Sequence, residues 1–211
     1  MFMSISLKKG EKIDLKKSNP GLSSLLVGLG WDPVSQKGGG FLSSLFGAGA
    51  ADVDCDASVF MLNEKGQMNS SKDLIYFGNL KSNCKSVVHT GDNLTGDGDG
   101  DDEQILVNLN KIPSNVDKLL FVVNIYDCVS RRQHFGMIKN AFIRVVDRET
   151  NKEIAKYNLT DDYSDKTALI VGTIYRYKDT WKFSAIGEGT RDTSLRDIRE
   201  NLARVECAYG V

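Results

Sequence analysis

The sequence has little of what most enzyme active sites and metal–thiolate sites require. It contains two histidines in 211 residues, and its four cysteines, Cys55, Cys84, Cys128 and Cys207, form no Cys-x-x-Cys pair. This spacing supports neither a zinc knuckle nor a dithiol redox motif, so we interpret the cysteines as reduced thiols. No Ser/His/Asp or Cys/His arrangement is recognisable either. We therefore expect a protein that is not an enzyme.

Long apolar runs and an excess of either charge are also missing. No stretch approaches the roughly 20 apolar residues that span a bilayer, and the first residues lack the apolar segment of a secretory signal. The formal net charge of -1 gives no general attraction to nucleic acid or to anionic lipid. We expect a cytoplasmic protein that binds no nucleic acid.

What the sequence does contain is a succession of short segments with strand character. They are rich in Val, Ile, Phe and Tyr and are separated by Gly, Asn or Asp clusters, which predicts an all-β, two-sheet antiparallel β-sandwich. We take residues 1–211 as a single domain, because this length suits one large sandwich. The predicted strands are 5–7, 12–15, 24–29, 58–62, 74–77, 86–89, 104–109, 118–126, 141–146, 153–158, 168–177 and 181–186.

Two segments allow a more specific prediction. Residues 118–126 (KLLFVVNIY) are almost continuously apolar, which favours a central strand covered on both faces. Thr193 and Ser194 are suited to cap a short C-terminal helix that runs to about Ala208 and packs on the sandwich through apolar residues at helical spacing. A second short helix around residues 130–138 is left open.

Residues 38–51 form a Gly- and Ala-rich insertion that nevertheless carries Phe41, Leu42, Leu45 and Phe46. One interpretation is a surface insertion whose aromatic side chains fold back on the domain. The other is an exposed apolar hairpin or short helix that docks on a partner or on a membrane. The sequence does not decide between them.

The most informative segment is 91–103, which holds six carboxylates and four glycines in thirteen residues without a basic side chain. Such a segment repels itself unless a cation binds to it, and its glycines allow carbonyl oxygens to turn inward. A hard cation with six to eight oxygen ligands suits it, and calcium suits a flexible loop better than magnesium. An EF-hand is excluded because Asp97 stands where that motif requires glycine.

A second acidic run precedes the strand predicted at 58–62. Asp52, Asp54 and Asp56 alternate with other residues, so in an extended chain their carboxylates face the same side and could share one ion. The alternative is an acidic strand end that faces solvent. Asp32 and Asp127 are further candidate metal ligands.

These acidic runs belong to a set of motifs that spans nearly the whole chain. The motifs are LVGLGWD at 26–32, DCDAS at 54–58, HTGDNLTGDGDGDDE at 89–103, RRQHFG at 131–136 and CAYG at 207–210. Together they resemble the signature of the TerD family. The resemblance implies a two-sheet β-sandwich that binds calcium through acidic loops, in proteins associated with tellurite resistance and with wider chemical or phage stress.

Carried over by position, the family's ion-binding motifs imply a set of metal ligands, and we expect two calcium ions. Which residue serves which ion is left open. The enlarged segment 38–51 and the charged stretch 191–200 depart from the family pattern. The implied ligands are Asp54, Asp56, Asp92, Asn93, Thr95 through its carbonyl, Asp99, Asp101, Asp102 and Glu103.

Three classes of function remain at this stage. The first is a stress-response binding module whose calcium ions order the loops at one end of the sandwich, so that this surface binds a protein partner such as another stress-operon protein. The second is a calcium-dependent membrane-docking module that inserts residues 41–46. The third is phosphoester hydrolysis, for which His89 is the best candidate base. Calcium activates water poorly, and this favours a binding module over hydrolysis.

Overall fold

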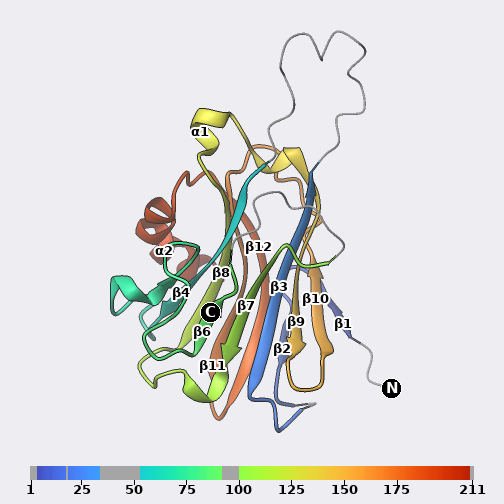
Figure 1. Ribbon diagram of the computed structural model, residues 1–211, viewed down its shortest axis with the longest axis vertical. Coiled ribbons are helices and arrows are strands. Elements are labelled where there is room, and N and C mark those ends of the chain that lie inside the picture. The colour runs from blue at the N-terminus through green and yellow to red at the C-terminus, as the bar shows by residue number, and fades with distance from the viewer. Residues whose placement is uncertain (1–3, 18, 34–52, 92–99, 210–211) are drawn as a thin grey trace.

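The structure is a computed structural model that describes residues 4–17, 19–33, 53–91 and 100–209 (Figure 1). These residues form two six-stranded sheets, with the order β1-β10-β9-β3-β7-β6 in sheet A and β2-β12-β11-β8-β4-β5 in sheet B. Every pairing between these strands is antiparallel except that of β1 with β10. The strands are β1 (Ile5–Leu7), β2 (Lys12–Asp14), β3 (Ser24–Pro33), β4 (Cys55–Leu62), β5 (Leu74–Ile75), β6 (Val87–His89), β7 (Glu103–Asn108), β8 (Lys118–Ile125), β9 (Ile138–Asp147), β10 (Lys152–Asn158), β11 (Ala168–Tyr177) and β12 (Thr180–Thr190).

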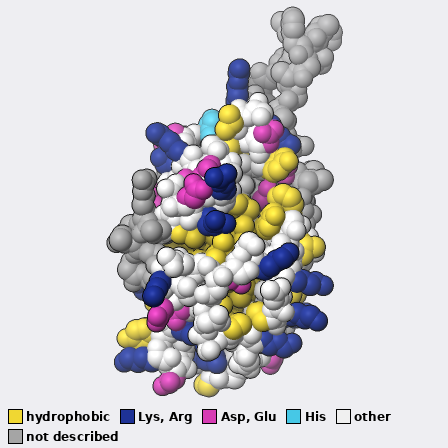
Figure 2. Space-filling model, turned by 90° about the vertical axis from the view of Figure 1, so that its left-hand side faces the viewer, with side chains coloured by type: hydrophobic (Ala, Val, Ile, Leu, Met, Phe, Trp, Pro, Cys, Tyr) yellow, Lys and Arg dark blue, Asp and Glu magenta, His cyan; other side chains and the backbone are white. Residues whose placement is uncertain are grey.

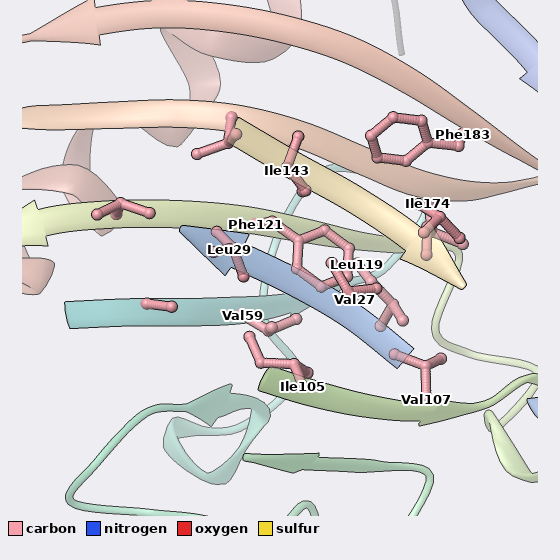
Figure 3. Packing of buried hydrophobic residues seen from close by; sticks show 14 of the residues in the cluster. Val27, Leu29, Val59, Ile105, Val107, Leu119, Phe121, Ile143, Ile174 and Phe183 are labelled. Atoms are coloured by element: carbon pink, nitrogen blue, oxygen red, sulfur yellow. The ribbon is translucent and has the colours of Figure 1, made fainter. Parts of the chain in front are cut away.

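The core lies between the two sheets, because alternate residues along each strand point inward. Val27, Leu29 and Ile143 of sheet A face Phe121 and Phe183 of sheet B, and all five side chains are buried (Figure 3). The β-branched and aromatic residues that predicted strands therefore make the inter-sheet packing. The all-β sandwich expected from the sequence is confirmed, and each of the twelve predicted strand segments overlaps a strand.

Sheet B has a second apolar cluster on its outer face, beneath the helix α2 (Leu195–Tyr209). Ile198 and Leu202 of α2 pack there against β4 and β8. Every residue of β8 is buried, as predicted for a central strand covered on both faces. The predicted capping residue Ser194 accepts a hydrogen bond from the backbone N–H of Asp197 (3.2 Å).

The remaining helical elements are short. The region of the second predicted helix contains one turn of α-helix, α1 (Cys128–Arg131), followed by the 3-10 turn η4 (Phe135–Met137). Two other 3-10 turns are η2 (Ser71–Asp73) and η3 (Leu109–Lys111). In the described part of the chain no helix has both the length and the apolar character needed to cross a membrane. The insertion predicted at 38–51 lies outside the described residues.

Candidate metal centre

The acidic segment 91–103 connects two neighbouring strands of sheet A at one end of the sandwich. β6 and β7 pair antiparallel, with His89 opposite Ile105, so the two ends of the segment lie side by side. The backbone N–H of Thr90 donates to the carbonyl of Gln104 (3.0 Å). The end of β3, the start of β4 and α1 lie at this same end (Figure 1). The described residues of both acidic runs therefore lie toward one end of the molecule.

Glu103 begins β7 and points between the sheets, where its side chain is fully buried. Its Oε2 accepts a hydrogen bond from the backbone N–H of Ala57 in β4. The ring of His89 is also buried, with Nε2 3.5 Å from Glu103 Oε2 and 3.2 Å from the carbonyl oxygen of Ala57. His89 Nδ1 accepts from the N–H of Gly91, so in the neutral ring Nε2 carries the proton. Glu103 and His89 thus join the end of sheet A to the start of β4 in sheet B.

Asp54 and Asp56 flank Cys55, whose side chain lies in the inter-sheet core. By strand alternation Asp56 faces the outer side of sheet B, and it is buried with 3% of its surface exposed. Asp54 lies 3.3 Å from the guanidinium of Arg131, so a basic side chain balances part of the acidic charge here. Burial and the nearby carboxylates of Asp56, Asp54, Glu103 and Asp102 raise the pKa of the Cys55 thiol. Carboxylates from both acidic runs therefore surround the start of β4.

Asn124 is a candidate ligand that the sequence reasoning missed. It pairs with Asp56 across β4 and β8, so the two side chains share the outer face of sheet B. Asn124 is 7% exposed, and its Oδ1 has no hydrogen-bond partner among the described residues. An amide oxygen is a ligand type that calcium accepts. The sequence did contain a sign of this candidate, because Asn124 is a polar residue within the apolar run of β8.

Asp101 and Asp102, near the C-terminal end of the acidic segment, contact sheet A. Both carboxylate oxygens of Asp101 accept hydrogen bonds from Arg144 of β9, at 2.6 and 2.9 Å. Asp102 Oδ2 accepts from the backbone N–H of Trp31 (2.7 Å), and the Asp102 N–H donates to the carbonyl of Leu29 (2.8 Å). Arg144 could not be predicted as a partner of Asp101, because it lies 43 residues away along the chain.

The two additional candidates make local contacts. Asp32 accepts a hydrogen bond from the side-chain amide of Asn140 (2.6 Å), and Asp127 accepts one from the Ser130 hydroxyl (2.7 Å). Within the described ranges, no three His, Cys, Asp or Glu side chains are placed to hold one metal ion. The other predicted ligands, Asp92, Asn93, Thr95 and Asp99, lie outside those ranges, so the ligand set stays a prediction.

The sandwich and its acidic β6–β7 connection define the class of protein. A family model described as the TerD domain matches residues 3–202, and the chain belongs to the TerD family. The resemblance inferred from the motifs is thereby confirmed.

Its relatives carry names from tellurium resistance and stress response. The chain is 64% identical to the stress response protein SCP2 of Bacillus subtilis (strain 168) over 196 residues, which cover 93% of this chain and 98% of that protein. It is 46% identical to the tellurium resistance protein TerD of Serratia marcescens over 209 residues, 99% of this chain and 98% of that protein. The family of this chain is therefore a tellurium-resistance and stress-response family.

A solved structure has the same fold. It is described as a homologue of telluride resistance protein (TerD) from Streptomyces coelicolor A3(2), and it superposes with a TM-score of 0.63 at 17% identity. The superposition covers 83% of this chain and 95% of that one. At this identity the likeness supports the sandwich and nothing finer.

Proposed function

We propose that this protein is a calcium-binding stress-response module of the cytoplasm, in which calcium orders the β6–β7 connection and the ordered surface binds a protein partner. The observation that carries the proposal is the pairing of Asp56 with Asn124. Both side chains are buried on one face, and the Asn124 oxygen has no hydrogen-bond donor among the described residues. A buried acceptor without a hydrogen-bond donor lowers the stability of the folded state by about 1–3 kcal/mol, and a bound cation would offset this loss.

The chemistry of the donor set fits calcium. The described candidates are Asp56 and Asn124 on the outer face of sheet B, together with Glu103 between the sheets and Asp54 and Asp102 near it. All five offer only oxygen atoms, which hard cations prefer. Because no three His, Cys, Asp or Glu side chains of the described residues are placed to hold one ion, the proposed site also takes ligands from Asp92, Asn93, Thr95 and Asp99. Bound calcium would supply positive charge that relieves the mutual repulsion of the carboxylates.

The contacts described above link such a site to both sheets. Glu103 contacts Ala57 of sheet B, and Asp102 contacts Leu29 and Trp31 of sheet A. An ion that orders the β6–β7 connection would therefore fix its position relative to β3 and β4. This is how calcium would shape one end of the molecule without any chemical reaction.

Exposed aromatic side chains beside Asp54 support the binding of a protein partner. Phe77 is 42% and Tyr126 47% exposed, and their rings meet edge to face at 6.1 Å. Arg131 lies over the Tyr126 ring at 5.4 Å and also contacts Asp54. Aromatic and arginine side chains are enriched at protein interfaces. Figure 2, which views the side that carries α1 and α2, shows hydrophobic side chains at the surface among charged ones.

Calorimetry on chelator-treated protein tests the proposal. We expect saturable calcium binding that Asp56→Asn and Asn124→Leu each weaken by about tenfold, because each removes an oxygen ligand or its charge. The matched control is Asp179→Asn, since this exposed aspartate lies in the β11–β12 turn at the opposite end of the sandwich. Absence of binding at millimolar calcium would contradict the proposal. A calcium-dependent interaction with anionic vesicles would instead favour the membrane-docking function.

A further inference from the structure

Basic and amide groups surround the carboxylate of Asp101. The side chain is fully buried, with Arg144 Nε 2.6 Å from Oδ1 and Arg144 Nη2 2.9 Å from Oδ2. The side-chain amide of Gln104 donates to Oδ2 as well (3.1 Å). A bidentate arginine–carboxylate pair fixes both the position and the orientation of the two groups.

Gly28 provides the space for this pair. In sheet A it lies opposite Gln104 of β7 on one side and opposite Arg144 of β9 on the other. A Cβ atom at Gly28 would overlap the Asp101 carboxylate. The carboxylate therefore lies directly over β3, between the two residues that hold it. Glycine is required here for space, because its φ is outside the left-handed region.

The contacts on either side of Asp101 continue along β3. The carbonyl oxygen of Gly100 lies close to Gly30, and Asp102 bonds to Leu29 and to the backbone N–H of Trp31. The C-terminal end of the acidic connection is thus held against the outer face of sheet A. From this position the chain continues through Asp102 to Glu103, which begins β7 and points between the sheets.

We propose that Asp101 is a positioning residue, and that its clamp with Arg144 over Gly28 holds Asp102 and Glu103 in place for the ion instead of Asp101 binding the ion itself. The effect on calcium rests on the proposed function. The clamp itself does not, because the contacts that join residues 100–102 to β3 and β9 are made between protein groups alone.

The two roles of Asp101 predict opposite effects of removing Arg144. If Asp101 were a ligand, Arg144 would compete with calcium for its carboxylate, and loss of the arginine would strengthen calcium binding. If the pair is a clamp, loss of the arginine releases the connection and weakens binding, although a repelling positive charge has been removed. The sign of the change therefore separates a ligand from a positioning residue.

The first test is calcium calorimetry on Arg144→Met, Asp101→Asn and the double variant. The clamp predicts that each single change weakens binding by about tenfold and that the double variant is no weaker than either, because both remove the same interaction. Arg148→Met is the matched control, since Arg148 is exposed just beyond the other end of β9. Unchanged or tighter binding in Arg144→Met would overturn the clamp.

Gly28→Ala tests the same clamp without altering any charge. The added methyl group displaces the Asp101 carboxylate, so calcium binding should weaken as in Arg144→Met. Gly21→Ala is the control, because an added Cβ there meets no atom within 4 Å. Binding by Gly28→Ala that equals binding by Gly21→Ala would contradict the arrangement.

A readout that needs no calcium keeps the two proposals separate. In chelator, the amide of Asp102 should exchange its hydrogen faster in Arg144→Met and Gly28→Ala than in the native protein, because its bond to Leu29 opens more often. Exchange at Ile105, within β7, reports whether the fold itself has loosened. If the native protein binds no calcium, but exchange at Asp102 is still faster in the two variants, the proposed function is wrong and the clamp is supported. Unchanged exchange at Asp102 would overturn the clamp.

Discussion

The outer faces of the two sheets are used differently. In sheet B every residue of β4 and every residue of β8 is buried. The outer face of these strands is covered because α2 packs on an apolar surface formed by Phe60, Leu120 and Val122. In sheet A the strand β7 alternates between buried and half-buried residues, and the neighbouring outer face carries the Asp101–Arg144 pair. One outer face thus adds to the core, while the other holds the end of the acidic connection. Changes on the helix-covered face should cost stability, and changes on the polar face should act mainly on the loop.

The largest effect is expected beneath α2. Ile198→Ala removes a side chain that is 1% exposed and leaves a cavity against β4 and β8, so the free energy of unfolding should fall by about 2–5 kcal/mol. Urea unfolding at neutral pH measures the loss, with the exposed Arg199→Ala as control. A loss no larger than that of the control would mean that α2 does not stabilise sheet B.

A smaller effect is expected for an apolar residue on the outer face of sheet A. Phe142 is half-buried, its ring lies over Gly30, and the Lys156 ammonium lies 3.9 Å from the ring centroid. Phe142→Ala should therefore lower the free energy of unfolding by about 1–2 kcal/mol, less than Ile198→Ala. Equal losses in the two variants, measured under the same urea conditions, would remove the contrast between the faces.

Asp147, at the end of β9, provides a pH-dependent prediction. Burial raises its pKa, but hydrogen bonds from Thr150, the Glu149 N–H and Asn19 outweigh burial and leave the pKa below its ordinary value. A lowered pKa in the folded state gives stability that is present above the unfolded pKa of about 3.9 and is lost as the pH falls through the folded pKa.

The matching variant is Asp147→Asn. It should cost about 1 kcal/mol at pH 7, and this cost should shrink as the pH falls below about 4. Urea unfolding of both proteins across this range measures the difference. A cost that stays constant down to pH 3 would show that the charge of Asp147 contributes nothing.

The smallest effect is expected on the solvent side of α2. Arg196 and Glu200 form an ion pair (3.0 Å) in which both side chains are mostly exposed, at 81% and 57%. Such pairs contribute little, so Arg196→Ala should leave the urea midpoint unchanged within error. A clear shift would mean that the helix-covered face depends on its surface charges as well as on burial.

Much of the fold could be predicted because the strands and the C-terminal helix follow from the residue pattern within each short segment. Short β-branched and aromatic runs located each strand, and the apolar run 118–126 identified the strand that is buried on both faces. Ser194 and the spacing of Ile198 and Leu202 located the helix that covers it. These features need only the period of a strand or a helix.

The contacts of the candidate site could not be predicted, because they depend on which strands become neighbours. Asp101 meets Arg144 only because β3 lies between β7 and β9 and carries Gly28 at the crossing. A bend at Asp102 interrupts strand alternation, so Asp101 and Glu103 lie on different sides of sheet A although they are two residues apart. The sequence motif implies the same role for Asp101, Asp102 and Glu103, so this difference between them could not be predicted from it.

The most direct test of calcium binding is urea unfolding of the native protein in calcium and in chelator. At a calcium concentration about one hundred times the dissociation constant, the folded state should gain about 2.7 kcal/mol, and magnesium should give much less. Asp56→Asn should lose most of this gain, whereas Asp179→Asn should keep it. An unfolding midpoint that is the same in calcium and in chelator would contradict a calcium-ordered connection between β6 and β7.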